Sequence, residues 1–267
     1  MSGTAPGGIG VYSISVPGLP MPELLAWCAR QGLAVVHLRG GPRGADLARR
    51  EVTTLRAWRA CAQAAGVVVT GVTADTDLAD LLSPDTAVRR RATGEVAVLA
   101  EAAGELGASW VRLLARRPPG AGGFAAAEVP EFAVPLLAEL HHPGWLDPGR
   151  LAALEGLLGR TPHLRLLADT LQLGAAVDAA GAGAGGRLER VMEWVRVVHL
   201  SDDGSGLDGS PGRRVVAEAA AALAAGGRTV EVALEWTGQP RTPARFLTLH
   251  QQAVDFWDRA HRSTGRP

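Results

Sequence analysis

Four side chains that can bind a metal ion recur along the chain, in the order Glu139, Asp169, His199 and Glu235. Each lies at or just after the end of a short apolar run, and the runs are Val134 to Leu140, Leu164 to Ala168, Val195 to Leu200 and Val230 to Leu234. Charged groups at the end of a buried strand are costly unless a partner neutralises them. Since carboxylates and imidazoles are common ligands of divalent cations, the pattern predicts one metal ion held by all four. Taken singly, each residue is more typical of a helix cap or a packing contact, but the regular series favours a metal site.

The apolar runs belong to eight segments that we expect to be β-strands, most of them separated by segments of helical length. These are Gly10 to Val16, Leu33 to Arg39, Gly66 to Val72, Ser109 to Ala115, Val134 to His141, His163 to Ala168, Val195 to Leu200 and Thr229 to Leu234. Eight strands that alternate with helices favour a closed α/β barrel, the (β/α)8 or TIM barrel. The length of 267 residues fits one barrel domain over residues 1–267. Because the C-terminal strand ends of a barrel meet at one mouth, the four candidate ligands become neighbours there.

Two segments depart from a regular barrel. Arg116 to Ala133, with the sequence RRPPGAGGFAAAEVPEFA, contains too many prolines and glycines for a long helix, so we expect the fourth helix to be shortened or missing. An uncovered strand would expose apolar surface, which a partner subunit or the chain's own tail would cover, and a homo-oligomer is one way to do so. The stretch Gly174 to Gly186 is rich in Gly and Ala. We expect it to be a loop near the mouth that leads into a helix at Leu188 to Trp194.

Composition excludes several classes of function. The 27 basic and 27 acidic side chains balance, so no overall field attracts nucleic acid or an anionic membrane, and we expect neither as a partner. The sequence contains no Lys, which excludes Schiff-base aldolase chemistry and lysine-bound pyridoxal phosphate. Cys28 and Cys61 form no CxxC motif, and no apolar stretch is long enough to span a membrane. A cytoplasmic protein acting on a small molecule is expected.

The short sequence motifs around the four candidate ligands resemble those of the metal site of the xylose isomerase-like barrel superfamily, the sugar phosphate isomerase/epimerase group. The similar motifs are Glu139-Leu140-His141, Leu167-Ala168-Asp169-Thr170, His199-Leu200-Ser201-Asp202, Pro211-Gly212 and Leu234-Glu235-Trp236. The resemblance covers roughly residues 8 to 260. It implies one divalent ion, which is Mn, Mg, Co or Zn, bound by all four residues. It also implies that Glu139 and Glu235 exchange a proton with the substrate carbon beside a carbonyl, while the metal stabilises the enediolate.

The dehydroshikimate dehydratases of the same superfamily suggest a second chemistry. By resemblance, His141 would be the base of a dehydratase, and Arg112 would clamp a substrate carboxylate. We also expect His37, Gln172 and Trp236 to contact the substrate, although core packing is as good an interpretation of Trp236 and hydrogen-bonded packing of His37.

Departures from the family pattern keep alternatives open. Gln172 stands where many members have His, and Ser205 stands where the epimerases have Arg. The extra His ligands of the trinuclear endonuclease IV are missing, which disfavours a nuclease. We therefore expect a metal-dependent isomerase or epimerase, with a dehydratase-like lyase as the second hypothesis. A catalytically silent barrel that binds metal or a partner is the third.

Overall fold

The computed structural model describes residues 8–119, 124, 128–181 and 183–264. Its eight parallel strands are hydrogen-bonded in sequence order, and β8 pairs with β1 to close a barrel. The strands are β1 Gly10–Tyr12, β2 Val35–Arg39, β3 Val68–Asp77, β4 Trp110–Ala115, β5 Leu136–Leu140, β6 Leu164–Asp169, β7 Val195–Asp202 and β8 Glu231–Trp236. The predicted α/β barrel is confirmed, with each strand near its expected place. The first strand is shorter than predicted because a 3-10 turn, η1, begins at Ser13.

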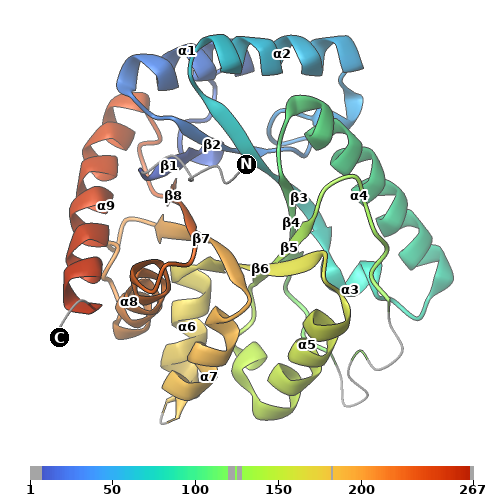
Figure 1. The fold of residues 1–267 in the computed structure, drawn as a ribbon, viewed down its shortest axis with the longest axis vertical. Helices are drawn as coiled ribbons and strands as arrows, with labels where there is room; N and C mark the ends of the chain where they lie inside the picture. Colours follow the sequence, from blue (N-terminus) through green and yellow to red (C-terminus); the bar gives the residue numbers. More distant parts are fainter. Residues whose placement is uncertain (1–7, 120–123, 125–127, 182, 265–267) are drawn as a thin grey trace.

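Helices surround the barrel and cover its outer face (Figure 1). They are α1 Met21–Gln31, α2 Val52–Ala64, α3 Leu78–Leu81, α4 Thr86–Leu106, α5 Pro148–Arg160, α6 Thr170–Ala180, α7 Ala184–Met192, α8 Pro211–Ala225 and α9 Pro243–Thr264. Two further 3-10 turns are η2 Leu47–Arg49 and η3 Pro143–Leu146. The main hydrophobic core lies between this helical layer and the strands, because outward-facing strand residues and inward-facing helix residues are buried together.

A second, small apolar cluster lies inside the barrel. It consists of Trp110, Leu137, Leu167 and Val197, one each from β4, β5, β6 and β7. Side chains two residues apart on a strand share a face. The residue two positions further along each of these strands therefore also points into the barrel, one layer nearer the mouth, and those residues are Arg112, Glu139, Asp169 and His199. Because side chains alternate between the two faces of each strand, a layer of polar side chains lies directly above this apolar cluster, on the side of the mouth.

The connection between β4 and β5 contains no helix among its described residues, 116–119, 124 and 128–135. Residues 120–123 and 125–127 lie outside the described part, so the expectation of a shortened fourth helix falls partly on residues that the structure does not describe. The described parts pack on the barrel: Val129 and Val134 are buried, and the ring of Phe124 stacks on Trp145 with 6.2 Å between centroids.

The stretch Gly174 to Gly186 was expected to be a loop, and this prediction is wrong. Residues 174–180 continue α6, and α7 begins at Ala184. The glycine at 174 serves close packing rather than chain reversal: a Cβ there would lie 2.7 Å from the backbone nitrogen of Arg213. A Cβ on Gly212 would likewise lie 2.1 Å from the carbonyl oxygen of Gly174. The two glycines let α6 and α8 approach closely beside the barrel.

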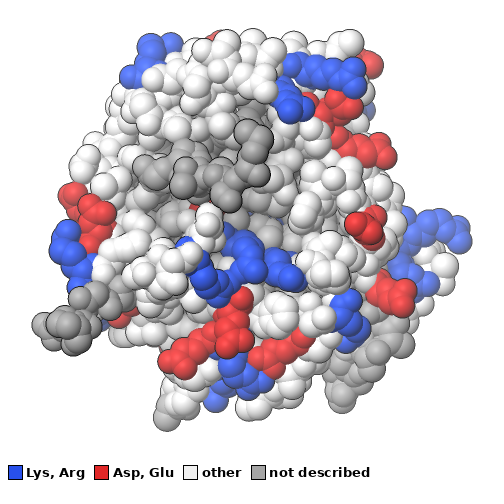
Figure 2. Space-filling view, viewed as in Figure 1, with Lys and Arg blue, Asp and Glu red and all other residues white. Residues whose placement is uncertain are grey.

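No helix in the described part of the chain is long and apolar enough to cross a membrane. The sequence as a whole is neutral, but its charges are not evenly distributed. Basic side chains gather near the middle of the face shown in Figure 2. Three arginines at the N-terminal ends of β6, β7 and β8 interact electrostatically: Arg165, Arg196 and Arg228. Partial burial first, and then the other two positive charges, lower the pKa of Arg196. Their guanidinium groups donate to backbone carbonyls.

Candidate metal centre

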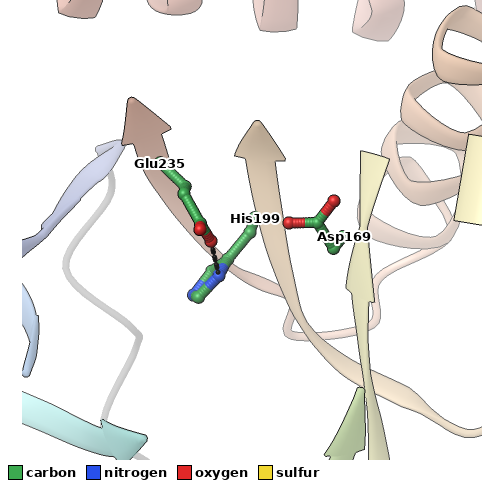
Figure 3. A group of neighbouring side chains, drawn as sticks. All are labelled: Asp169, His199 and Glu235. Atoms are coloured by element: carbon green, nitrogen blue, oxygen red, sulfur yellow. Dashed lines mark hydrogen bonds and ion pairs between the residues drawn. The ribbon is translucent and has the colours of Figure 1, made fainter. Parts of the chain in front are cut away.

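Three of the four predicted ligands meet inside the mouth of the barrel (Figure 3). Asp169 ends β6, His199 lies in β7 and Glu235 lies in β8, and one ligand atom of each falls within 4.8 Å of the others. The register of the sheet produces this, because Asp169 pairs with His199 and Glu235 pairs with Ser201 on the strand between them. Asp169 and His199 are buried, whereas Glu235 is partly exposed. We refer to these three residues as the triad.

Glu139, the fourth predicted ligand, is buried on β5 but is not part of the triad. One of its carboxylate oxygens lies 2.7 Å from Nε of Arg112, and the other lies 2.9 Å from Nε2 of His141. These are ion pairs whose atoms are close but poorly aligned for hydrogen bonds. Arg112 also donates to the carbonyl of Ala74 at 2.9 Å. The carboxylate of Glu139 is thus engaged by Arg112 and His141.

The carboxylates of the site have opposite electrostatic surroundings. Burial, followed by the charges of Glu235 and Glu139, raises the pKa of Asp169 to about 7. Burial and then the charge of Glu139 raise the pKa of Glu235 to about 7. Burial would also raise the pKa of Glu139, but Arg112 and His141 outweigh it and lower the value to about 2. The folded protein therefore disfavours negative charge on Asp169 and Glu235, and a divalent cation bound between them would stabilise that charge.

Two members of the triad, Glu235 and His199, begin a buried line of hydrogen bonds that continues into the barrel. Nδ1 of His199 lies 2.9 Å from Oε2 of Glu235, and its Nε2 lies 2.9 Å from Nδ1 of His37. Nε2 of His37 in turn lies 2.6 Å from Oε1 of Glu231. Both histidine side chains are fully buried. The line runs from Glu235 to Glu231, four residues earlier on β8, through two imidazole rings.

This line determines which nitrogen of His199 carries the proton. Burial would raise the pKa of Glu231, but hydrogen bonds from His37, Thr70 and Trp110 outweigh it and lower the value, so Glu231 is an anionic acceptor. Burial lowers the pKa of His37 and keeps that ring neutral. A neutral His37 that donates from Nε2 can only accept at Nδ1, so His199 donates from Nε2. Nδ1 of His199 therefore carries no proton, and its lone pair faces Glu235, the neighbouring member of the triad. A metal ligand requires such a free lone pair.

Solved structures with the same fold match nearly the whole chain. An L-ribulose 3-epimerase matches with a TM-score of 0.65 at 16% identity, over 96% of this chain and 95% of that chain. A xylose isomerase domain protein from Salmonella typhimurium gives a TM-score of 0.61 at 15% identity, over 97% and 99%. A probable 3-DHS dehydratase from Bacillus anthracis gives 0.59 at 18%, over 93% and 98%. This chain therefore shares the barrel fold of these proteins. No protein-family model and no curated protein matches its sequence.

Within the barrel, the predicted substrate contacts lie at different depths. His37 is fully buried behind His199, so it faces a ring and not the mouth. Trp236 is 1% exposed, belongs to the main core and donates to the carbonyl of Pro240, which favours its packing interpretation. Gln172 is partly exposed in the first turn of α6, where its backbone N–H donates to Oδ1 of Asp169. Asp169 thus caps that helix and belongs to the triad at once.

Two residues that contact the histidines of this line were not singled out from the sequence: Glu231, which is bonded to His37, and Tyr12, which stacks on His199. Glu231 opens β8, where a charged residue is typical of a strand end, and only its inward parity with Glu235 marks it. Tyr12 is the single tyrosine of the chain; its ring stacks on His199 with 5.0 Å between centroids, and its hydroxyl is 2.7 Å from Oγ1 of Thr73. Alternation on β1 could have placed Tyr12 inside the barrel, but nothing in the sequence indicates which ring it contacts.

Proposed function

We propose that this protein is a divalent-metal-dependent isomerase or epimerase that moves a proton at the carbon next to a carbonyl of a small sugar-like substrate. The observation that carries the proposal is the meeting of the triad beside a second buried glutamate, Glu139 on β5, whose pKa is shifted in the opposite direction to that of Glu235 on β8. In the metal-free protein the pKa of Glu139 is lowered to about 2, whereas the pKa of Glu235 is raised to about 7. Carboxyl groups whose environments separate their pKa values are typical acid and base pairs.

The triad would hold the metal ion through two carboxylates and Nδ1 of His199, and Glu139 would complete the predicted set of four. An oxygen-rich site with one imidazole suits Mn, Mg, Co or Zn. When bound, the ion would polarise the substrate carbonyl and stabilise negative charge on its oxygen. Glu139 and Glu235, on β5 and β8, would accept and return the proton on the two sides of the substrate carbon. The epimerase named among the structural matches supports this chemistry.

A dehydratase is the second candidate, supported by the match to the probable 3-DHS dehydratase. In that reaction His141 would be the base and Arg112 would bind a carboxylate. The arrangement around Glu139 argues against both roles. Burial would lower the pKa of His141, but its close contact with the carboxylate of Glu139 outweighs burial and raises the pKa, which favours the protonated ring. Arg112 is already engaged by Glu139 and Ala74. An acid at His141 fits proton return better than proton removal.

Metal content tests the first half of the proposal. Elemental analysis should find about one divalent ion per chain in the wild type and much less in His199→Ala, because a lost ligand weakens the site and leaves carboxylates that repel one another. Glu23→Gln, which removes an exposed carboxylate on α1, is the matched control and should retain the ion. Equal metal content in His199→Ala and the wild type would contradict the metal site.

Deuterium exchange tests the chemistry. A panel of ketoses and dehydroshikimate is incubated with the metal-loaded protein in D2O, and the products are analysed by mass spectrometry and NMR. We expect deuterium at one carbon of a recovered ketose, without loss of water. An ultraviolet-absorbing, dehydrated product would favour the lyase, and metal binding without turnover of any compound would favour the silent barrel.

The connection between β4 and β5 supports a further proposal about assembly. If the segment 116–133 contains no long helix, apolar barrel surface beside it needs cover, and a second copy of the chain would supply it. Light scattering at high protein concentration should then show a dimer or larger species. A strict monomer would contradict cover by a second copy.

A further inference from the structure

A cavity of about 460 Å³ opens beside the mouth of the barrel. Its walls come from the segment after β1, the end of β2 with the loop that follows, the beginning of α1, and Arg241 after β8. All of these lie at the C-terminal end of the strands, which is the end that carries the triad. The cavity has the volume of a small-molecule site and combines apolar side chains such as Leu24 with charged ones.

The charged side chains of the cavity are all arginines. Arg39, Arg43, Arg50 and Arg241 line it, and no carboxylate does. Asp75 lies just outside and accepts from Arg39 at 3.3 Å and from Arg43 at 3.1 Å, so one carboxylate serves two guanidinium groups. The cavity therefore keeps an excess of positive charge, although the chain as a whole is neutral.

Two of these arginines have no anionic partner among the residues that the structure describes. Arg50 lies over the ring of Trp58, 5.6 Å from its centroid, and donates to the carbonyl of Ala45. Arg241 has a buried Nε with no hydrogen-bond partner among the described residues. A buried donor that lacks an acceptor is costly, and a charged one more so. An acceptor supplied by a ligand would remove that cost.

We propose that this cavity binds an anionic oxygen group, a phosphate monoester or a carboxylate, carried by a small molecule. Guanidinium groups match both groups because their N–H donors are planar and suit two oxygens at once. If the proposed function holds, the small molecule is the substrate of the metal centre, which lies at the same end of the strands as the cavity. Ser13 and Val16 line the cavity, and Ser15 between them accepts from the backbone N–H of Trp236, the residue after Glu235.

Binding of simple anions tests the cavity without any turnover. Inorganic phosphate and acetate are titrated separately into the wild type, Arg241→Gln and Arg30→Gln. Arg30 is an exposed arginine in the last turn of α1, at the other end of the helix that begins beside the cavity. We expect Arg241→Gln to weaken binding of the anion roughly 10-fold or more, the usual effect of losing a charge-assisted hydrogen bond. Arg30→Gln should bind like the wild type.

The preferred probe identifies the group: tighter binding of phosphate indicates a phosphate ester, and tighter binding of acetate indicates a carboxylate. Absence of binding by both anions, or equal binding by all three proteins, would overturn the proposal. His199→Ala should retain anion binding, so failure of the metal centre does not mask the result.

If a ketose turns over, its phosphorylated or carboxylated form should have the higher kcat/KM, and Arg241→Gln should reduce that preference. A preference for the neutral ketose would separate the cavity from the substrate.

Discussion

Glu235→Gln should stabilise the metal-free protein while it weakens the metal site. In the absence of a cation, the folded state must hold Glu235 beside other carboxylates in a buried layer, and its pKa of about 7 instead of 4.5 reflects this. For an acid whose folded pKa is raised, the cost is absent below the unfolded pKa, grows as pH rises and is complete above the folded pKa. Glutamine has the same shape and still contacts Nδ1 of His199, but it carries no charge.

The size of the effect follows from the two pKa values. The gap between 4.5 and about 7 corresponds to about 3 kcal/mol at pH 8, at about 1.36 kcal/mol for each pH unit. A gain of this size would raise Tm by roughly 5–10 °C in a protein of this length. At pH 5 the gain should be well under half as large, because Glu235 is then mostly protonated in the folded state.

Urea unfolding in the presence of a chelator, at pH 5 and pH 8, measures this gain. Glu231→Gln is the matched control, since it makes the same change four residues earlier on β8. The pKa of Glu231 is lowered, because its hydrogen bonds outweigh burial, so its charge contributes stability above the unfolded pKa. Glu231→Gln should therefore lose stability at pH 8, where Glu235→Gln gains it. Loss of stability in both variants, or a gain for Glu235→Gln that does not change with pH, would refute the electrostatic reasoning.

Two other predictions test the structure around the site. His37→Asn should weaken metal affinity by roughly 10- to 100-fold, which is the usual effect of losing the hydrogen-bond partner of a ligating histidine. Isothermal titration with Mn²⁺ at fixed pH measures the affinity. Unchanged affinity would contradict the role of His37 in orienting His199. Gly174→Ala should destabilise the protein by about 1–3 kcal/mol in urea, because the new Cβ would meet the Arg213 backbone at 2.7 Å. Gly94→Ala, in α4 with nothing within 4 Å of the new Cβ, should instead gain about 0.5–1 kcal/mol.

The sequence predicted the barrel and the meeting of the triad, because both follow from local patterns. Apolar runs at regular intervals predict buried parallel strands, and parallel strands bring their C-terminal ends together. His141 and Glu139 are two residues apart in the sequence, so alternation along a strand directs both side chains to one face, and their atoms lie 2.9 Å apart. Geometry of this kind is decided within one strand or between neighbouring strands.

The partner that each buried side chain contacts could not be predicted in the same way. The sequence placed Glu139 with the triad, but its position is decided by Arg112 on β4, and the sequence does not specify which cation a buried carboxylate will contact. The α6 helix was missed because glycine lowers helix propensity, and the close approach of α8 that makes Gly174 favourable is a tertiary effect. His37 was interpreted by its type alone, and its contact with His199 spans 162 residues.

The line from Glu235 to Glu231 extends the site through the barrel interior. In barrels of this kind the C-terminal end of the strands carries the chemistry, and residues at the N-terminal end usually serve stability. Glu231 begins β8 and is 20% exposed, yet it reaches His199 through a single imidazole. Because Glu231 is the anionic acceptor, it selects the tautomer of His37, and His37 selects the tautomer of His199. A substitution of Glu231 should therefore change which nitrogen of His199 carries the lone pair that faces Glu235, without moving any residue at the mouth.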